Sequence, residues 1–510
     1  MAASAGTFLP KWESRFYVLV WVLHSMAAFV GAVFTSQELR EWLNQWMGDS
    51  SYINGLKKDS SDIEWSLFRT SWSSTFAFFA IHSAVFHAVY RTLEKQTATY
   101  VIIVFWAVLH SVFASVTSLE VLAVLAIIAV TLTVFTKSEL PAWVLCISFV
   151  LQVNNYAPFS TEAGNYYREF NIYFYTAVQI LNFCIHLHRH SNYDISKPVV
   201  LRFLQFILYP PYTMTLIVLY EDFDKQMTER EKKPELDMNF KDFGQKLLRL
   251  GFWSIFLDFI HHVIFVNAIF ASPYTLIAGL NNYKLSSLAY VAGQLFHVKY
   301  VVLFGLPSWF ALVDGMKPPG PPICISRVSK YSQMWRHFDR GLYEFLKNQV
   351  YIPLMKDQKG AALIARRLFA MVSAFLFVLA WHGTSSQYVS WVSLSALELC
   401  IERIGKAIGR SKAFVDFSER VGPLNVIRLQ AFSMLATVIP GIFGVFFFLG
   451  SEGIGSTIFG KVLGEGFLQI FTLQLGVLGS GQVLLHLLVL GYCFNATCLY
   501  LEHKQKIKRN

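Results

Sequence analysis

The chain carries little charge for its length. Only 15% of its 510 residues are Asp, Glu, Lys or Arg, whereas 54% are hydrophobic. A soluble globular domain needs more polar surface than this, so the composition excludes an ordinary soluble protein and indicates a polytopic membrane protein. Several apolar runs approach the ~20 residues that cross a hydrocarbon core as a helix. They are 16–34, 100–117, 251–270, 431–449 and 481–499.

The signatures of several other protein classes are missing. The six cysteines are scattered, without the paired spacing of a disulfide framework or a metal site. The short alternating segments of a membrane β-barrel are absent, as is the internal repeat of many transporters. No small-residue cleavage site follows the first apolar run, so we expect a retained helix there. The remaining class is an all-α integral membrane protein, a helical bundle of about 10–12 spans plus re-entrant hairpins.

The formal net charge of +10 does not indicate a nucleic-acid partner, because the basic residues lie in short loops between apolar runs. The segment 325–367 holds nine Lys or Arg against three acids, and the positive-inside rule places it in the cytosol. The linker 402–428 and the tail EHKQKIKRN belong on the same side. The last five residues resemble a lysine-based retrieval signal of the endoplasmic reticulum, although a basic tail is also a common stop-transfer anchor. We expect the endoplasmic reticulum membrane and a cytosolic C-terminus.

The stretch SQMWRHFDRGLYEFLKNQVYIPL, residues 332–354, is dense in charge. Its periodicity predicts an amphipathic helix with Trp335 on the apolar face. Asp339, four residues after Trp335 and three before Leu342, falls on that same face. A carboxylate among apolar side chains needs a partner or a function. One interpretation is a salt bridge to Arg336, three residues earlier. The other is that Asp339 is a catalytic residue.

The apolar pieces 368–381 and 388–400 are each shorter than a comfortable span, and predicted cytosolic segments flank the pair. They predict a hairpin within the membrane, with AWHGTSSQ at its turn and His382 at membrane depth. A histidine at a helix end is often structural, but an imidazole can take and return a proton near neutral pH. With Asp339 on a neighbouring segment, His382 supplies the minimum for general base catalysis, the carboxylate orienting the imidazole or the nucleophile.

The sequence MWRHFDRGLYEFLKNQVYIPL followed by FVLAWHG resembles the paired signature of the membrane-bound O-acyltransferase family. The similarity includes PPICISRVSKYSQMW and FLGSEGIG and covers roughly residues 295–456. Most members carry Asn where this chain has Asp339, so the Asp resembles the Hedgehog acyltransferase branch. The chain departs from the family at YPPYTMTLIVLYEDF, where Pro210 and Pro211 stand without a Gly-Pro, and no role is carried over to that stretch.

The resemblance implies a protein-cysteine N-palmitoyltransferase. Such an enzyme transfers palmitate from palmitoyl-CoA to the α-amino group of an N-terminal cysteine on a secreted Hedgehog-type ligand, inside the endoplasmic reticulum. It further implies that His382 and Asp339 are catalytic, that Trp335 gates the acyl-CoA site and that Cys324 binds haem. A related inactive branch lacks the histidine, which this chain keeps.

The predicted parts suit this chemistry. A palmitoyl thioester is already activated, so the enzyme has to position the acyl carbon, take a proton from the amine and stabilise the oxyanion. The basic segment 325–367, which includes Arg336, suits the phosphates of cytosolic CoA, whereas the ligand lies in the lumen. A tunnel through the membrane is therefore expected. His297, in LFHVKY, either belongs to the tunnel wall or is an interfacial anchor.

Three regions are predicted along the chain. Residues 1–198 form N-terminal transmembrane helices, and residues 199–480 form the acyltransferase catalytic core. Residues 481–510 form the last transmembrane helix and the basic cytosolic tail. The core contains every segment that carries the resemblance.

Two other functions remain open from the sequence. An O-acyltransferase with a lipid, glycerol or serine acceptor would keep the fold and the donor, and a transporter would use intramembrane Asp and His to relay protons or bind a solute. For the other polar groups of the apolar segments we predict structural roles. Asp258 and His262, one helical turn apart, predict an internal hydrogen-bond pair rather than a metal site. His186 and His190 predict the end of an interfacial segment, and Asp314 predicts loop chemistry at a segment end.

Overall fold

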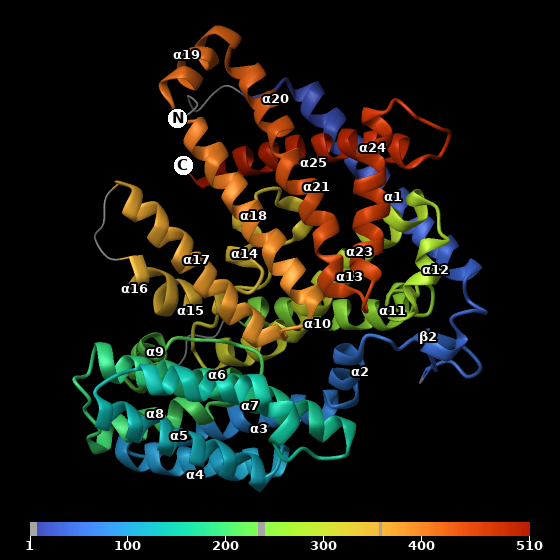
Figure 1. Cartoon of the computed structure of the whole chain (residues 1–510). Helices are drawn as coiled ribbons and strands as arrows, with labels where there is room; N and C mark the ends of the chain where they lie inside the picture. The colour runs from blue at the N-terminus through green and yellow to red at the C-terminus, as the bar shows by residue number, and fades with distance from the viewer. Residues whose placement is uncertain (1–7, 51, 233–239, 356–359, 510) are drawn as a thin grey trace.

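The computed structural model describes residues 8–50, 52–232, 240–355 and 360–509. These residues are almost entirely helical (Figure 1). Their single sheet is a small antiparallel pair, β1 (Met47–Asp49) and β2 (Lys57–Asp59), in which Met47 lies opposite Asp59. The prediction of an all-α membrane protein is confirmed.

Most helices follow one another with short connections, and the longest ones join α1 to α2 and α13 to α14. The first group is α1 (Lys11–Glu38), α2 (Ile63–Thr70), α3 (Trp72–Thr92), α4 (Lys95–Phe113), α5 (Val116–Thr136), α6 (Leu140–Tyr156), α7 (Ala163–Arg189), α8 (Lys197–Leu208) and α9 (Tyr220–Lys232). The second group is α10 (Phe240–Ile260), α11 (Val266–Ala271), α12 (Tyr274–Ala278), α13 (Asn282–Val313), α14 (Tyr331–His337), α15 (Arg340–Phe345), α16 (Ile352–Met355), α17 (Gly360–His382) and α18 (Ser386–Ile408). The third group is α19 (Lys412–Val421), α20 (Pro423–Ser433), α21 (Leu435–Gly444), α22 (Phe446–Leu449), α23 (Ile454–Ile458), α24 (Glu465–Phe471) and α25 (Ser480–Arg509). Single 3₁₀ turns occur at Asn44–Trp46, Pro210–Tyr212 and Ile325–Arg327, and π-helical turns at Leu346–Tyr351 and Phe459–Gly464.

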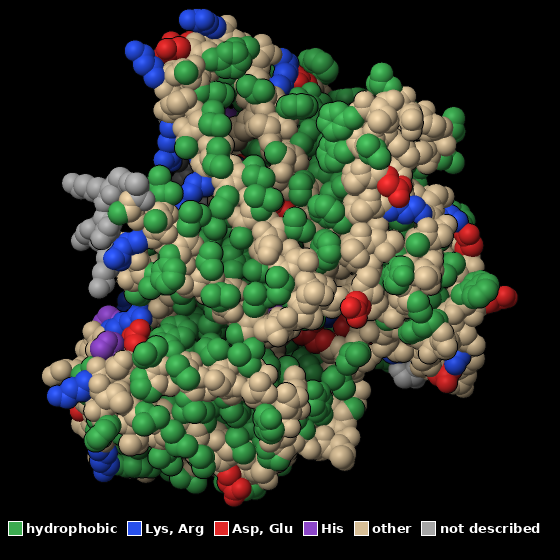
Figure 2. All heavy atoms as spheres, in the orientation of Figure 1, with side chains coloured by type: hydrophobic (Ala, Val, Ile, Leu, Met, Phe, Trp, Pro, Cys, Tyr) green, Lys and Arg blue, Asp and Glu red, His purple; other side chains and the backbone are tan. Residues whose placement is uncertain are grey.

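Seven helical stretches of the described residues are long and apolar enough to cross a membrane. They are Lys11–Glu38, Lys95–Phe113, Val116–Thr136, Asn282–Val313, Ala362–His382, Pro423–Leu449 and Ser480–Ile507. Their burial differs, since only 11% of the apolar window of α1 is buried, against 56% for α13. Hydrophobic side chains cover much of the visible surface (Figure 2). An apolar surface of this extent suits contact with lipid.

The helix α13 lies at the centre of the fold. It packs against α1 and α10, and α1 in turn packs against α25. Figure 1 shows α3 to α8 as one layer, in blue and green, and α17 to α25 as another, in orange and red. Within the first layer α7 packs against α5 and α6. The hairpin of α17 and α18 belongs to the second layer, α17 packs against α6 of the first layer, and His382 is the last residue of α17.

Polar caps mark where several helices begin. The Asp62 carboxylate accepts a hydrogen bond from the backbone N–H of Trp65 (3.0 Å) at the start of α2. The Asn281 side chain accepts one from Lys284 N (2.9 Å) at the start of α13. Each cap satisfies an N–H group that has no partner inside its helix.

The structure corrects the expected length of several segments. The apolar run 251–270 is not one span, because α10 ends at Ile260 and α11 begins at Val266. The predicted hairpin is present, but α17 and α18 contain 23 residues each, so they are longer than re-entrant pieces. Both helices continue beyond their apolar parts into charged residues, which hydropathy alone does not assign to a helix in the membrane.

Candidate active site

His382 is the last residue of α17 and lies at the turn of the hairpin. The next residue, Gly383, has a φ of +116°, and a Cβ added there would lie 3.2 Å from the Tyr388 ring. Glycine adopts such a backbone conformation far more readily than other residues. The His382 ring meets Trp391 of α18 and Phe448 of α22 edge to face, with centroids 5.4 and 5.0 Å away. These contacts fix the ring at the end of the helix.

Asp339 lies between two short helices rather than inside one long helix. The predicted helix over 332–354 is interrupted, because α14 ends at His337 and α15 begins at Arg340. Asp339 is the N-cap of α15, and its Oδ1 accepts a hydrogen bond from the backbone N–H of Leu342 at 2.9 Å. Burial raises the pKa of Asp339 from 3.8 to about 6, against the lowering effect of the backbone N–H groups of Gly341 and Leu342.

Arg336 is not the partner of Asp339. Its side chain is exposed, and the guanidinium lies 5.7 Å from the centre of the Tyr343 ring. No ion pair joins these two described residues. The salt-bridge interpretation of Asp339 is therefore wrong, and the carboxyl is held by backbone N–H groups instead.

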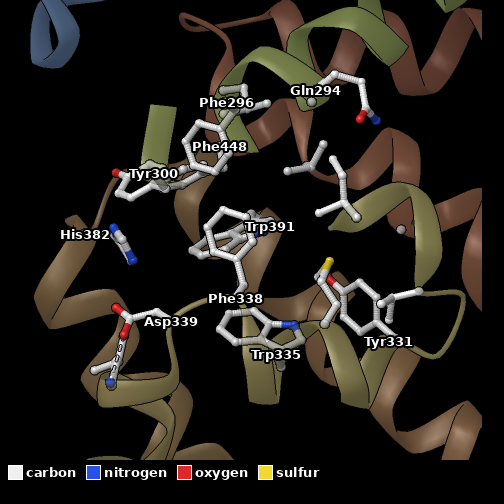
Figure 3. Close-up of a pocket in the computed structure, with 18 of the residues that line it drawn as sticks. Gln294, Phe296, Tyr300, Tyr331, Trp335, Phe338, Asp339, His382, Trp391 and Phe448 are labelled. Carbon is white, nitrogen blue, oxygen red and sulfur yellow. Dashed lines mark hydrogen bonds between the residues drawn. The ribbon is translucent and has the colours of Figure 1, made fainter. Parts of the chain in front are cut away.

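Asp339 and His382 line one cavity of about 490 Å³. Figure 3 shows the His382 ring between the Tyr300 hydroxyl on one side and the Asp339 carboxyl on the other. Trp335 also lines the cavity and stacks on Trp391, with centroids 5.6 Å apart and ring planes at 27°. Three residues predicted from separate parts of the sequence thus meet in one space.

The polar part of the wall is acidic. Among the described residues that line the cavity, Glu64 and Asp339 are charged and none is Lys or Arg. Glu64 accepts a hydrogen bond from the Tyr300 hydroxyl (2.9 Å) and pairs with Lys299 (2.9 Å), which also pairs with Asp62 (2.9 Å). The single positive charge of Lys299 neutralises only one of the two carboxylates, so this cluster keeps a net negative charge and favours a cationic ligand. Figure 2 shows acidic side chains recessed in a hollow near the position of α2.

Two other predicted residues lie outside the wall. His297 is buried in α13, and its ring lies 6.4 Å from that of Phe338, which does line the cavity. His297 therefore sits behind the wall and not in it. Arg336 is exposed on α14 and does not line the cavity, although its guanidinium lies over the ring of Tyr343, which does.

Cys324 gives no support for haem. A haem would need a wide space in front of the sulfur, but the large cavity opens beside Ile325 and Ser326 and does not include Cys324 in its wall. In the described part of the chain, no group of three or more His, Cys, Asp or Glu could hold a metal ion. The structure therefore gives no support to the predicted haem at Cys324, and no catalytic step is assigned to one.

The comparison with protein families decides the class. The model for MBOAT, the membrane-bound O-acyltransferase family, matches residues 66–447. This chain belongs to that family. The predicted resemblance is confirmed, and an acyltransferase is favoured over a transporter.

Similar curated proteins are named as palmitoyltransferases. Protein-cysteine N-palmitoyltransferase HHAT of Mus musculus is 24% identical over 495 residues, which cover 92% of this acyltransferase and 96% of the relative. Protein-cysteine N-palmitoyltransferase Rasp of Drosophila melanogaster is 29% identical over 264 residues, about half of each chain at 51%. The HHAT-like protein of Mus musculus is 22% identical over 68% of this chain and 69% of its own.

Glu64 and Tyr300 carry no sequence signal strong enough to predict them. They are 236 positions apart, and helix packing alone brings α2 against the end of the cavity. The one local hint is that Asp62 and Glu64 open a short helix, a position where acids are common for capping. The role of Glu64 in the cavity wall becomes visible only in the structure, where Lys299 lies beside it.

The Asp258 group is structural in this acyltransferase. The Asp258 carboxylate accepts hydrogen bonds from the Tyr52 hydroxyl and Trp65 Nε1, both at 3.2 Å, and pairs with Arg69 at 2.7 Å. His262 meets Asp258 only at the backbone, with Nδ1 2.8 Å from the carbonyl oxygen. The predicted internal hydrogen bond is therefore to the main chain.

The interpretation of Asp314 as loop chemistry is wrong. Its side chain is fully buried, although it does lie at the end of α13. The carboxylate accepts hydrogen bonds from Ser83 Oγ (2.6 Å) and the Tyr209 hydroxyl (2.7 Å) and pairs with His82 Nε2 (2.8 Å). Asp314 thus joins α3, α13 and Tyr209, the residue before the Pro210–Tyr212 turn.

The histidines at the end of α7 meet an acid. His186 and His190 lie 3.3 and 3.2 Å from the same Glu221 oxygen at the start of α9. Their rings stack with centroids 5.7 Å apart. The two side chains do share one helix face, as their spacing indicates.

Proposed function

We propose that this acyltransferase transfers palmitate from palmitoyl-CoA to the α-amino group of the N-terminal cysteine of a secreted, Hedgehog-type ligand. The observation that supports the proposal most strongly is that His382 and Asp339 line one cavity (Figure 3). The names of the mouse and fly relatives, both protein-cysteine N-palmitoyltransferases, support the same reaction.

In this proposal His382 is the general base. The ammonium form of the acceptor amine first releases one proton to water; the neutral amine nitrogen then attacks the thioester carbonyl carbon, and His382 takes the second proton that the nitrogen loses. The tetrahedral intermediate then breaks its C–S bond, and the proton passes from His382 to the CoA thiolate. The products are an amide and free CoA. Asp339, on one side of the imidazole in Figure 3, orients the ring and stabilises its positive charge during the transfer.

The charge of the cavity wall supports an amine acceptor. An α-amino group has a pKa of about 8 and arrives largely as an ammonium ion at neutral pH. The carboxylates of Glu64 and Asp339 attract such a cation into the cavity. A serine hydroxyl or an uncharged lipid would gain nothing from them. This observation favours N-acylation over the O-acyltransferase alternative.

The donor is proposed to bind with its acyl thioester inside the cavity and its phosphates outside. The described lining residues include no cation that could neutralise phosphates. Exposed Arg336 follows Trp335, which does line the cavity, so Arg336 is placed to contact the phosphates at the mouth. Trp335 contacts the donor directly. His297 supports the wall through Phe338.

The proposed location is the endoplasmic reticulum membrane, with the C-terminus in the cytosol. The ion pair of Lys330 with Glu502 near the end of α25, at 2.5 Å, supports the same side for Lys330 and the C-terminal tail. The segment 325–367 and the tail are both rich in Lys and Arg, in agreement with the positive-inside rule. The division into regions 1–198, 199–480 and 481–510 remains a proposal.

Transfer to a defined peptide tests the function. Purified protein is incubated with labelled palmitoyl-CoA and a peptide that begins Cys-Gly-Pro, and the peptide is expected to gain the label. The same peptide with an acetylated amine should gain none. Equal labelling of the acetylated peptide would show that palmitate is attached to a side chain and not to the α-amine. If the peptide with the free amine gained no label, the proposal would be contradicted.

A further inference from the structure

A second cavity, of about 410 Å³, lies between the first turns of α4 and α8. It shares no lining residue with the cavity of His382 and Asp339. The helices α4 and α8 pack against each other in the blue and green layer (Figure 1). The charged side chains that line this second cavity, the α4–α8 cavity, are Glu94, Lys95, Lys197, Arg202 and Glu231. Charged side chains gathered in a cavity of a membrane protein mark a candidate binding site.

Three of these side chains pair with one another. The Glu231 carboxylate of α9 accepts hydrogen bonds from Arg202 at 2.8 and 3.0 Å, and it also pairs with Lys95 at 3.0 Å. Arg202 further pairs with Asp224 at 2.9 Å. The Glu231 side chain is only 2% exposed. These ion pairs join α4, α8 and α9 and thereby fix the wall of the cavity.

The other two charged side chains, Lys197 and Glu94, have no such partner. Both residues are exposed, and neither forms an ion pair with another described residue. The Lys197 ammonium lies 5.3 Å from the centre of the Tyr100 ring, which also lines the cavity. The wall therefore presents one positive and one negative group without a counter-charge. A zwitterionic ligand supplies a counter-charge to each of them.

An exposed apolar face begins where the α4–α8 cavity ends. Val101, Val104 and Val108 of α4 are 39%, 64% and 57% exposed. Their spacing of three and four residues places them on one face of the helix. The helix α4 is long and apolar enough to cross a membrane, so this face suits contact with acyl chains. A ligand with its polar part in the cavity can lay its apolar part along these valines.

The cavity lies at the same end of the protein as the basic segment 325–367. At the end of α7, Arg189 donates hydrogen bonds to the Gln349 side chain (3.1 Å) and backbone oxygen (3.2 Å) in that segment. The chain then turns back, since Tyr193 N donates to Leu187 O at 3.0 Å, and α8 begins at Lys197. Basic pockets between membrane helices on such a side suit lipid headgroups.

We propose that the α4–α8 cavity binds the phosphoethanolamine headgroup of a membrane phospholipid. The phosphate pairs with Lys197, and the ammonium group pairs with Glu94. The acyl chains lie along the face of Val101, Val104 and Val108. Free phosphate would leave Glu94 without a counter-charge, and an uncharged lipid would leave both groups so. The bound lipid joins α4 to α8 and stabilises the first layer, away from the site of acyl transfer.

Thermal unfolding of the delipidated full-length protein in detergent tests this site. Dioleoylphosphatidylethanolamine has the headgroup and the chains, dioleoylglycerol has the chains alone, and glycerophosphoethanolamine has the headgroup alone. Each probe is titrated, and the half-saturating concentration for the rise in unfolding temperature is measured. The assay contains neither palmitoyl-CoA nor an acceptor peptide, so its outcome does not depend on the proposed function.

Four variants separate the two charges from general effects. Lys197→Gln removes the cation, and the matched Lys197→Arg keeps it. Glu94→Gln removes the anion. Lys412→Gln is the control, since Lys412 is exposed on α19 and does not line the cavity. Each rise is taken against the same preparation without lipid, so a change in the stability of the variant itself does not enter.

Dioleoylphosphatidylethanolamine is expected to raise the unfolding temperature of the wild-type protein in a saturable way. Dioleoylglycerol and glycerophosphoethanolamine should have little effect at the same concentration. Lys197→Gln and Glu94→Gln should each raise the half-saturating concentration about fivefold, as for the loss of one exposed ion pair. Lys197→Arg and Lys412→Gln should stay within about twofold of the wild-type value.

Four results would overturn the inference. Equal stabilisation by dioleoylglycerol would assign binding to the acyl chains alone, and equal stabilisation by glycerophosphoethanolamine would show a site for a small soluble ligand. An unchanged half-saturating concentration in both Lys197→Gln and Glu94→Gln would place the lipid elsewhere. The same loss in Lys412→Gln would show a general effect of surface charge.

Discussion

Replacing Asp339 by Asn should separate the stability of the active site from its chemistry. Asn keeps a side-chain oxygen that can accept the hydrogen bond from Leu342 N, which is 2.9 Å long in the wild-type protein. Asn and Asp are about equally good N-cap residues, so the start of α15 should be preserved. The substitution removes the buried charge alone.

The size of the effect follows from the pKa of Asp339. Burial raises this pKa from 3.8 to about 6. The folded protein therefore binds the proton more tightly than the unfolded chain, and ionisation of Asp339 lowers the free energy of unfolding. The shift corresponds to roughly 3 kcal/mol, with no loss below about pH 4, a growing loss between about pH 4 and 6, and the full loss above that range.

Thermal unfolding in detergent at two pH values measures this difference. At pH near 7.5, Asp339→Asn should be more stable than wild type by up to ~3 kcal/mol, and near pH 4.5 most of the gain should vanish. Asp339→Ala is the control, since it also loses the cap and about 1 kcal/mol with it. Palmitoyl transfer by Asp339→Asn should fall about a hundredfold or more. An Asn variant less stable than wild type at pH 7.5, or a stability difference independent of pH, would refute the reasoning.

Three further substitutions test other parts of the site. His382→Ala should fold normally but lose about 10²–10⁴ in transfer rate, and a folded variant with full activity would remove His382 from the mechanism. Glu64→Gln should raise the KM for a free-amine peptide with little change in the KM for palmitoyl-CoA. This increase should be smaller in high salt, which screens the charge. An unchanged KM for the peptide would speak against a role of Glu64 in binding the amine. Gly341→Ala should lower the free energy of unfolding by about 1–3 kcal/mol, because a Cβ would lie 2.4 Å from the Ile217 carbonyl oxygen. Unaltered thermal unfolding of Gly341→Ala would show that α15 can move away.

The sequence predicted the parts of the site that depend on local pattern. The apolar runs, the hairpin turn before Gly383 and the inward position of Asp339 all follow from short stretches of residues. The reason for the position of Asp339 was nevertheless different. Helical periodicity assumes an unbroken helix, whereas the Asp339 side chain caps a new helix and thereby competes with continuation of the old one.

The remaining parts depend on contacts between distant segments. Glu64 reaches the cavity because α2 packs against α7 and α3, and its ion pair with Lys299 of α13 joins residues too far apart in the sequence to be predicted from spacing. Glu398 and Glu402 lie one turn apart on α18, yet Glu402 is hydrogen-bonded to Ser332 whereas Glu398 meets the Tyr331 side chain. Spacing cannot distinguish such residues, because the surrounding helices determine which carboxyl finds a partner.

The chemical bond in the product gives the most direct test of the proposed reaction. After incubation with palmitoyl-CoA, the Cys-Gly-Pro peptide is fragmented in a mass spectrometer before and after treatment with neutral hydroxylamine, which cleaves thioesters and leaves amides. The proposed mechanism predicts palmitate on the N-terminal nitrogen, resistant to hydroxylamine and nearly absent from reactions with His382→Ala. Palmitate that hydroxylamine releases, or that His382→Ala attaches as fast as wild type, would contradict it.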